Sequence, residues 1–456
     1  MAEKTRPNIL FIMSDQHRHD YMRCAGSEFI NTPNLDRLAE KGVRFTQCCS
    51  NAPVCTPARI GLATGLQPAR LGSLDNQSFL PRSVTTYYQR LRDAGYRVGC
   101  VGKLDLAKPE GYIGRDGDRP CVFGWGFTHP AEVEGKMHAG QSPEPQGPYG
   151  LMLEKKGLYG KFHEDYMARR KKGWRIGAAH DSVLSTEDFA DSYVGRRAAE
   201  WIEKVADDFP WHYFVSFVGP HDPYDPPTEY AERYRNADVP APVSAETAGK
   251  PGWIRARQEL GTPEEIAETR RQYCASTELI DFEIGRMLEA LEKRGMGENT
   301  VIVYSSDHGE MLGDHGLYHK SCAYEAAMRV PLIAAGPGIA SGRISDALVE
   351  MSDLNPTICE LAGLPSQERI DARSFGAVLS GQSDSHRTET VAALRNFRCV
   401  RTDRYKYVQN YNDTRELYDL VEDPDELNNI AGEQPERCRE FGELLVERYK
   451  EGNWNR

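Results

Sequence analysis

The sequence predicts an α/β fold in which helices flank a mostly parallel sheet. Four short apolar runs are typical of strands buried on both faces, as in parallel sheets: 8–14, 96–101, 211–218 and 300–304. Segments with helical periodicity separate these runs, which is the alternation expected of a parallel sheet. Polar or charged residues follow each run directly. Because open α/β sheets bind ligands at the carboxyl ends of their strands, we expect one cleft at one edge of the sheet.

The helices between these strands begin with residues that favour helix starts. Pro33 suits the first helical position, because its missing N–H needs no partner there. Ser185 with Asp188, and Thr262 with Glu265, each resemble a capping box. The expected helices cover about 33–41, 85–94, 185–206 and 262–294.

The segment 106–185 differs in character from the rest of the chain. It is rich in glycine, proline and charge and has little apolar periodicity. Its basic stretch, 155–175, is better explained as a solvated, partly helical surface than as an anion-binding one. Long insertions in compact domains more often shape a pocket than have no role. We therefore expect this insertion to set substrate specificity, through His163, His180 or one of its arginines.

Composition narrows the classes of function. The chain has 456 residues, enough for one large α/β domain and a smaller one, and its formal net charge of −12 argues against a nucleic-acid surface. No stretch approaches the ~18 apolar residues of a membrane span. The N-terminal run 8–13 is too short for a signal peptide, and eleven cysteines without a C-x-x-C pair fit reduced thiols better than disulfides. We expect a cytoplasmic protein that binds neither nucleic acid nor membranes; its oligomeric state stays open, with a homo-oligomer among the alternatives.

The stretch 51–65, N-A-P-V-C-T-P-A-R-I-G-L-A-T-G, places a cysteine at the start of a helix. Pro57 belongs in the first turn, so Cys55 lies at the helix N-terminus, where backbone N–H groups favour negative charge. Arg59, one turn further on, can direct its guanidinium back toward the same place. From these residues alone, a small buried cysteine and a functional one are about equally good interpretations.

The motif C-T-P-A-R, followed by G-L-A-T-G, resembles the Cys-x-Pro-x-Arg signature of the type I sulfatases, within the alkaline phosphatase superfamily. In that family a formylglycine-generating enzyme oxidises the cysteine to formylglycine, whose hydrate is the nucleophile. The resemblance therefore implies formylglycine at Cys55. It also implies an alkaline-phosphatase-like fold, with a large mixed, mostly parallel sheet flanked by helices.

The same resemblance implies two parts of the chain, a catalytic domain, 1–384, and a C-terminal subdomain, 385–456. In the tail we expect short strands separated by turns at 389–394, 397–402 and 405–411. The stretch 416–428, E-L-Y-D-L-V-E-D-P-D-E-L-N, resembles the sulfatase subdomain with its small antiparallel sheet and packing helix.

The metal positions of the family fall on Asp15, Gln16, Asp307 and His308, with the modified Cys55 as a further ligand. Two carboxylates and an amide oxygen suit Ca²⁺, which we expect most, or Mg²⁺. The histidine nitrogen, where many sulfatases have asparagine, makes Mn²⁺ a competitor. Taken alone, an Asp-His pair after a strand is better explained as a cap or a core hydrogen bond. The other matching positions favour one divalent cation.

The remaining family positions supply charge around the nucleophile. Arg59 matches the residue that holds the nucleophile, and Lys103 and Lys320 match those that bind the oxygens of the transferred group. His221, in G-P-H-D-P, matches the histidine near the leaving oxygen and is the expected general acid. Asn76 suits a further polar contact to the ester or the nucleophile.

One position departs from the family pattern. Sulfatases typically read G-K-x-H, whereas this chain reads Gly102-Lys103-Leu104-Asp105. Asp105 would act either as the base that helps to expel sulfate or as a residue of substrate recognition.

These residues predict a metal-dependent hydrolase of a small anionic ester, the sulfate of a sugar, a small alcohol or a phenol. The closest alternative is a phosphonate monoester or phosphodiester hydrolase, because those enzymes share the Asp-Gln and Asp-His metal pairs and the modified cysteine. A third hypothesis is a non-catalytic anion-binding protein in which Cys55 stays a thiol. A protein that only binds an anion would not need the nucleophile, metal and cation positions together.

Overall fold

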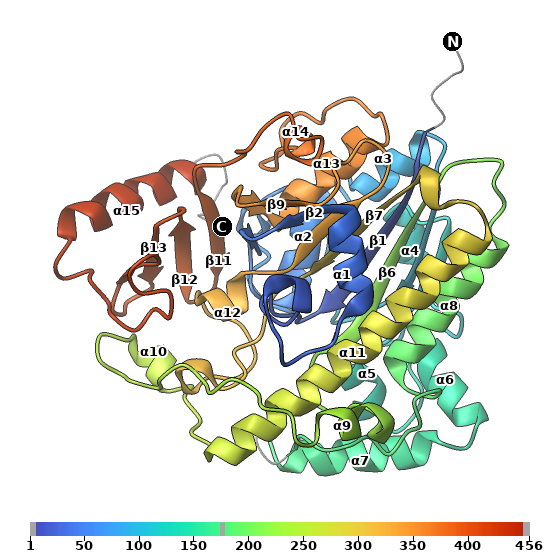
Figure 1. Ribbon diagram of the computed structural model, residues 1–456, viewed down its shortest axis with the longest axis horizontal. Coiled ribbons are helices and arrows are strands. Elements are labelled where there is room, and N and C mark those ends of the chain that lie inside the picture. The colour runs from blue at the N-terminus through green and yellow to red at the C-terminus, as the bar shows by residue number, and fades with distance from the viewer. Residues whose placement is uncertain (1–5, 174–177, 450–456) are drawn as a thin grey trace.

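The computed structural model describes residues 6–173 and 178–449 and confirms the α/β fold (Figure 1). Its main sheet has eight strands, in the order β5-β4-β6-β1-β7-β8-β2-β9. Their bounds are β1 (Asn8–Asp15), β2 (Gly42–Phe45), β4 (Arg97–Gly102), β5 (His129–Glu132), β6 (Trp211–Pro220), β7 (Thr300–Ser306), β8 (Leu332–Ala335) and β9 (Arg343–Ser345). The five strands from β5 to β7 are parallel, and β8 runs antiparallel to both of its neighbours. The sheet is therefore mixed and mostly parallel, as predicted.

The predicted helices are present between these strands. The helices are α1 (Pro33–Lys41), α2 (Cys55–Thr64), α3 (Tyr87–Asp93), α4 (Pro120–Gly124), α5 (Lys136–Gln141), α6 (Pro148–Lys155), α7 (Tyr159–Lys171), α8 (Ala190–Lys204), α9 (Thr228–Tyr234), α10 (Gly252–Arg255), α11 (Pro263–Lys293), α12 (Glu325–Met328), α13 (Leu354–Leu361), α14 (Gly376–Leu379) and α15 (Pro435–Tyr449). Pro33 is the first residue of α1, and Thr262 and Glu265 form the predicted capping box of α11.

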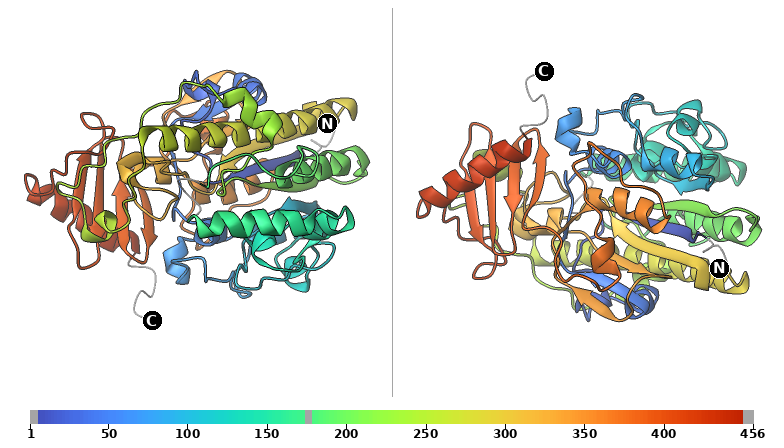
Figure 2. Two further views of the ribbon diagram at one scale, coloured as in Figure 1. Left: turned by 90° about the horizontal axis from the view of Figure 1, so that it is seen from below. Right: turned by 90° about the horizontal axis from the view of Figure 1, so that it is seen from above.

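Helices cover both faces of the main sheet, because successive side chains of a strand point to opposite sides (Figure 2). In β1, Ile9 and Phe11 belong to a core that includes side chains of α2, α3 and α13. Leu10 and Ile12 belong to a second core, shared with α1, α8 and α11. The continuous apolar run of β1 is thus explained by burial on both faces.

The register of the sheet brings the carboxyl ends of four neighbouring strands together. Ser14 pairs with Ser306 across β1 and β7, and Met13 pairs with Ser216 across β1 and β6. Gly102, the last residue of β4, also pairs with Ser216. The residues that follow β4, β6, β1 and β7 therefore leave the sheet side by side, as predicted from the polar residues after each run.

A smaller antiparallel sheet with a packing helix forms the C-terminal part, in agreement with the expected fold class. Its strands are β11 (Thr390–Leu394), β12 (Phe397–Arg401), β13 (Tyr405–Asn410) and β14 (Glu416–Asp419). This sheet and α15 lie at one side of the larger body, in red (Figure 1). Buried ion pairs connect the two parts, since Arg401 and Lys406 lie 3.0 and 3.1 Å from the carboxylate of Glu325 in α12.

The start of α8 is a correction to the sequence prediction. The helix begins at Ala190, five residues after the expected Ser185. The Ser185 hydroxyl donates to the Asp188 carboxylate at 2.9 Å, and the Asp188 N–H donates to the Ser185 carbonyl at 3.1 Å. These bonds close a turn instead of a capping box, in which the serine oxygen would accept a backbone N–H.

The insertion 106–185 contains more regular structure than its composition predicts. It contributes the edge strand β5 and the helices α4 to α7. The basic stretch 155–175 is partly helical, as expected, and its last two residues, 174 and 175, lie outside the described residues. The ring nitrogen Nδ1 of His163 contacts the Gly140 carbonyl oxygen and that of His180 contacts the Asp181 carbonyl oxygen, both within the insertion itself.

Two further observations concern membranes and cysteines. None of the helices in the described residues is both long and apolar enough to cross a membrane. All eleven cysteines lie in the described part of the chain, and each is a free thiol there. Two of them form β3 (Cys48–Cys49), which pairs in parallel with β10 (Val349–Glu350).

Gly102 should be essential for the junction between β4 and Lys103. Its φ of 104° favours glycine, and an added Cβ would lie 1.8 Å from the Ser216 carbonyl oxygen. We expect Gly102→Ala to lower the free energy of unfolding by at least ~2 kcal/mol, measured by chemical denaturation. The control is Gly442→Ala in α15, where an added Cβ has nothing within 4 Å and should raise stability by up to ~1 kcal/mol. Equal stabilities of the two variants would contradict this expectation.

Candidate active site

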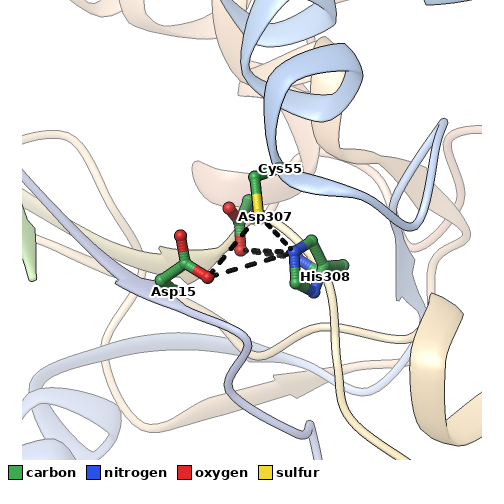
Figure 3. A group of neighbouring side chains, drawn as sticks. All are labelled: Asp15, Cys55, Asp307 and His308. Atoms are coloured by element: carbon green, nitrogen blue, oxygen red, sulfur yellow. Dashed lines mark hydrogen bonds and ion pairs between the residues drawn. The ribbon is translucent and has the colours of Figure 1, made fainter. Parts of the chain in front are cut away.

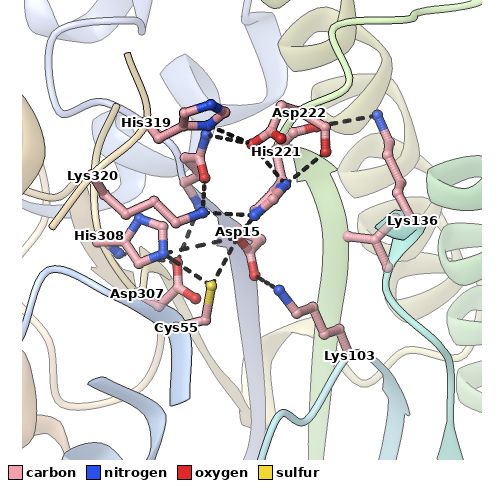
Figure 4. A network of polar contacts seen from close by, with 12 residues as sticks. Asp15, Cys55, Lys103, Lys136, His221, Asp222, Asp307, His308, His319 and Lys320 are labelled. Carbon is pink, nitrogen blue, oxygen red and sulfur yellow. Dashed lines mark hydrogen bonds and ion pairs between the residues drawn. The ribbon is translucent and has the colours of Figure 1, made fainter. Parts of the chain in front are cut away.

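The four predicted strand ends deliver polar and charged side chains to one place. Asp15 ends β1, Lys103 follows β4, His221 follows β6 and Asp307 follows β7 (Figure 4). Lys103 Nζ lies 2.6 Å from Asp15 Oδ2, and His221 Nε2 lies 3.9 Å from Asp15 Oδ1. All four residues are buried. Charged groups brought together in this way, away from water, interact strongly.

Cys55 enters this group from the start of α2, as the sequence predicts. Its Sγ lies 3.2 Å from Nε2 of His308 and 3.8 Å from Oδ1 of Asp15 (Figure 3). Asn76 Oδ1 accepts the backbone N–H of Thr56 at 3.0 Å. The contact shown for Asn76 is therefore to the first turn of the helix that carries the cysteine, where N–H groups lack helical partners.

Four of these side chains could hold a metal ion. Asp15, Cys55, Asp307 and His308 each present one ligand atom, and these atoms lie within 4.8 Å of one another (Figure 3). His308 Nδ1 donates to the Gly309 carbonyl oxygen at 3.0 Å, which leaves Nε2 as the ring nitrogen that faces the group. Carboxylate oxygens with an imidazole nitrogen are donors that suit a divalent cation. The residues present thus fit such an ion.

Gln16, another predicted ligand, lies beside this group. Its backbone N–H donates to Asp307 Oδ1 at 3.0 Å. Its side-chain nitrogen donates to Asp222 Oδ1 at 3.3 Å and to Glu310, and its side-chain oxygen accepts from Lys320. Both ends of the amide therefore contact charged groups.

Arg59 joins the two carboxylates of the site. Its Nη2 lies 2.9 Å from Asp15 Oδ2, and its Nε lies 2.8 Å from Asp307 Oδ2. Its Nη1 donates to the Ser216 hydroxyl at 2.9 Å and to the Lys103 carbonyl at 2.5 Å. The buried guanidinium thus connects α2 with the ends of β1, β4, β6 and β7.

Asp105, where the family pattern has histidine, lies between two lysines. Its Oδ2 is 3.1 Å from Lys103 Nζ and 2.9 Å from Lys108 Nζ. Burial raises the pKa of the Asp105 carboxyl, but the two lysines outweigh that effect and hold it well below its usual range. The carboxylate is therefore ionised and engaged in two ion pairs.

His221 and Lys320 face each other near the cysteine (Figure 4). His221 Nδ1 lies 2.7 Å from the Asp222 carbonyl oxygen, so this nitrogen donates and Nε2 is left to accept. Lys320 Nζ lies 2.6 Å from that Nε2. The Asp222 carboxylate also lies 3.0 Å from His319 Nδ1, and Lys136 Nζ donates to the His221 carbonyl at 3.4 Å. Lys320 and the His221 imidazole thus share one hydrogen bond.

The cations determine the charge state of the cysteine. Burial and the Asp15 carboxylate raise the pKa of the Cys55 thiol, but Lys103, Lys108 and Lys320 together hold it well below its usual range. Burial likewise raises the pKa of Asp15, and Lys103 is the largest of the charges that bring it well below its usual range. The site therefore stabilises negative charge at position 55.

Sequence reasoning missed five residues around this group: Lys108, Lys136, Asp222, Glu310 and His319. Asp222 and His319 are chain neighbours of predicted site residues, and Glu310 follows two residues after one, which is a usable signal. No comparable signal exists for Lys136, because it lies on α5 of the insertion and reaches the site only through the fold.

Comparison with known proteins identifies the family. The family model described as "Sulfatase" matches residues 7–364. The chain belongs to the sulfatase family. It is therefore a hydrolase of sulfuric esters. A second model, "N-sulphoglucosamine sulphohydrolase, C-terminal", matches residues 313–448, which include the small sheet.

Individual relatives of this sulfatase match it over nearly its whole length. An arylsulfatase of Clostridium perfringens is 27% identical, with 98% of this chain and 97% of the relative covered. The phosphonate monoester hydrolase of Agrobacterium radiobacter has a similar structure, with a TM-score of 0.80 at 24% identity over 98% of this chain and 96% of its own. BT4656, solved with its substrate D-glucosamine-2-N,6-O-disulfate, has a TM-score of 0.79 at 24% identity over 98% and 99% of the two chains. Both structures share the fold of this chain.

Removal of the Arg59 guanidinium should damage the site and the fold together. We expect Arg59→Ala to lower the free energy of unfolding by ~3–5 kcal/mol, because two buried carboxylates lose their common counter-charge. Arg59→Lys should lose less stability but most of the sulfatase activity, since one ammonium cannot reproduce the two-sided contact. Chemical denaturation and sulfate release from an aryl sulfate measure the two effects. The control is Arg404→Ala, at an exposed ion pair with Asp419, which should change neither.

Proposed function

We propose that this sulfatase acts through a formylglycine formed from Cys55 and hydrolyses the sulfate ester of a sugar, a small alcohol or a phenol to release inorganic sulfate. The observation that carries this proposal is the position of Cys55. It lies at a helix N-terminus, within the group that could hold a metal, and near enough to Lys103 and Lys320 for both to lower its pKa. A cysteine kept for packing alone needs neither metal ligands nor lysines around it.

Formylglycine at this position would supply an aldehyde hydrate, whose second hydroxyl group allows sulfate to leave without attack by water. The modification requires a formylglycine-generating enzyme, which we propose as a partner during maturation. The thiol of Cys55 is wholly buried in the folded chain. The modification would therefore take place before folding is complete.

Asp15, Gln16, Asp307 and His308, together with the modified Cys55, would hold one divalent cation. The oxygen donors favour Ca²⁺ or Mg²⁺, and the His308 nitrogen keeps Mn²⁺ a competitor. A cation there would supply positive charge that polarises a sulfate oxygen and stabilises negative charge as it develops.

The other residues bind the anionic group and handle a proton. Lys103 and Lys320 would bind the oxygens of the transferred group, since their ammonium groups act on the same position 55. Lys320 donates to Nε2 of His221, so the pair can deliver one proton to the leaving oxygen. Arg59 would act through Asp15 and Asp307, whose carboxylates it holds.

Asp105 and the insertion would have supporting roles. A carboxylate with a strongly lowered pKa is a weak base, so we assign Asp105 to holding Lys103 and not to proton removal. The insertion places Lys108 and Lys136 beside the site, which supports a role in substrate selection. Asn76 would stabilise the start of α2 through its bond to Thr56.

The modification is tested by mass spectrometry of the Cys55 peptide from protein made in its native host. We expect an aldehyde in place of the thiol. Cys55→Ala should lower sulfatase activity by at least ~10³-fold without loss of folding, because the nucleophile is absent. The control is Cys24→Ala, outside the site, which should keep full activity. An unmodified Cys55 in fully active protein would rule the mechanism out.

The closest alternative reaction is hydrolysis of a phosphonate monoester or phosphodiester by the same nucleophile. Lys103 and Lys320, whose charges act on Cys55, favour any tetrahedral anion. The Asp-Gln and Asp-His pairs are common to both kinds of enzyme. Rates on matched aryl sulfate, aryl phosphodiester and aryl phosphonate substrates decide between them. We expect kcat/KM to be at least ~10-fold higher on the sulfate; the opposite order would assign the chain to the alternative.

A further inference from the structure

Glu310 is a buried carboxylate next to the site that the proposed reaction does not use. It is fully buried and follows Asp307 and His308 in D-H-G-E. Its Oε1 accepts the backbone N–H groups of Leu312 at 3.1 Å and His319 at 2.5 Å. Its Oε2 accepts the side-chain nitrogen of Gln16. One carboxylate therefore connects a candidate metal ligand with the loop that carries Lys320.

The neighbours of the Gln16 amide determine which end is nitrogen and which is oxygen. Its nitrogen faces the Glu310 carboxylate and, at 3.3 Å, the Asp222 carboxylate. Its oxygen faces the ammonium group of Lys320. Carboxylates only accept hydrogen bonds and ammonium groups only donate them, so a rotation of the amide by 180° would oppose like groups at every contact. The oxygen is the atom of this amide that a cation can bind.

We propose that Glu310 is a positioning residue that, together with Asp222, orients the Gln16 amide so that its oxygen is available to a divalent cation. This inference rests on the cation site of the proposed function. Ligands of a metal ion usually need partners of their own to hold the donor atom in place. For Gln16 these partners are two acidic side chains from other segments, Asp222 after β6 and Glu310 after β7.

The contacts of Glu310 predict what a neutral side chain would do there. In Glu310→Gln, the side-chain oxygen must remain with the N–H groups of Leu312 and His319, because both contact the same atom. The new NH₂ group then meets the NH₂ group of Gln16. The Gln16 amide then either keeps this contact between two donors or rotates, which sets its oxygen against the Asp222 carboxylate and turns its nitrogen toward Lys320 and the cation. We expect the affinity for Mn²⁺ to fall ~10–100-fold.

A substitution at Gln16 separates the effect of ligand positioning on Mn²⁺ affinity from the effect of ligand charge. Gln16→Glu adds a carboxylate, ordinarily the stronger ligand for a hard cation, but places it against Glu310 and Asp222. We expect Mn²⁺ affinity to fall in this variant also. In the double variant Gln16→Glu with Glu310→Gln, the NH₂ group at 310 can donate to the carboxylate at 16. We expect that variant to bind Mn²⁺ at least ~10-fold more tightly than Gln16→Glu alone.

The experiment measures Mn²⁺ binding to the full chain by the electron paramagnetic resonance signal of the free ion. All proteins are compared at the same extent of Cys55 modification, determined by mass spectrometry, and their folding is checked by circular dichroism. The matched control is Glu350→Gln. Glu350 is a buried glutamate that accepts the side-chain nitrogen of Gln67 at 2.9 Å and the N–H of Val391 at 3.0 Å. Its substitution should leave Mn²⁺ affinity unchanged.

The outcomes distinguish this inference from the function on which it rests. Weaker binding in both single variants, recovery in the double variant and an unchanged control support it. Unchanged affinity in Glu310→Gln, or tighter binding in Gln16→Glu, overturns it while the cation site stands. Absence of Mn²⁺ binding in the unsubstituted protein overturns both. Should Glu310→Gln fail to fold, Gln16→Glu decides the question by itself, since weaker Mn²⁺ binding than in the unsubstituted protein supports the inference and equal or tighter binding overturns it.

Discussion

The ion pairs of Arg59 with Asp15 and Asp307 are the interaction on which the rest of the site depends. All three groups are buried, so each charge would be costly without its partners. Arg59 lies one turn after Cys55 in α2, and Asp15 and Asp307 lie at the carboxyl ends of neighbouring parallel strands. The same side chain therefore sets the distance between the cysteine and the acidic groups, and it connects a helix on one face of the sheet with the strand ends.

The charges around Cys55 are balanced in a way that suits both parts of the proposed function, a cation and an anionic ester. Asp15, Asp307 and the sulfur form the negative side, which suits a divalent ion. Lys103 and Lys320 form the positive side, which suits the oxygens of a sulfuryl group. Because both sides are removed from water, the charges act on each other with little screening. Loss of one group would leave another without compensation.

The C-terminal part supports the loop that carries Lys320. That loop leads into α12, whose Glu325 forms buried ion pairs with Arg401 and Lys406 of the small sheet. From another direction, the Arg257 guanidinium donates to the Lys320 carbonyl oxygen at 2.6 Å. The loop that carries Lys320, a candidate site residue, is thus held by contacts on several sides. Support of this loop is therefore a role for the C-terminal part, which contributes none of the candidate ligands.

The sequence by itself determined the main strands, their polar carboxyl ends and the cysteine at a helix start. Apolar runs and a proline in the first turn act over a few residues, so the positions of Asp15, Cys55 and Asp307 could be predicted. The tertiary structure alone decided the edge strand β5, the short strands β2, β8 and β9, the start of α8 and the contacts of Gln16. Gln16 and Glu310 are 294 residues apart in the chain. Such contacts depend on the packing of distant segments, and local patterns carry no information about it.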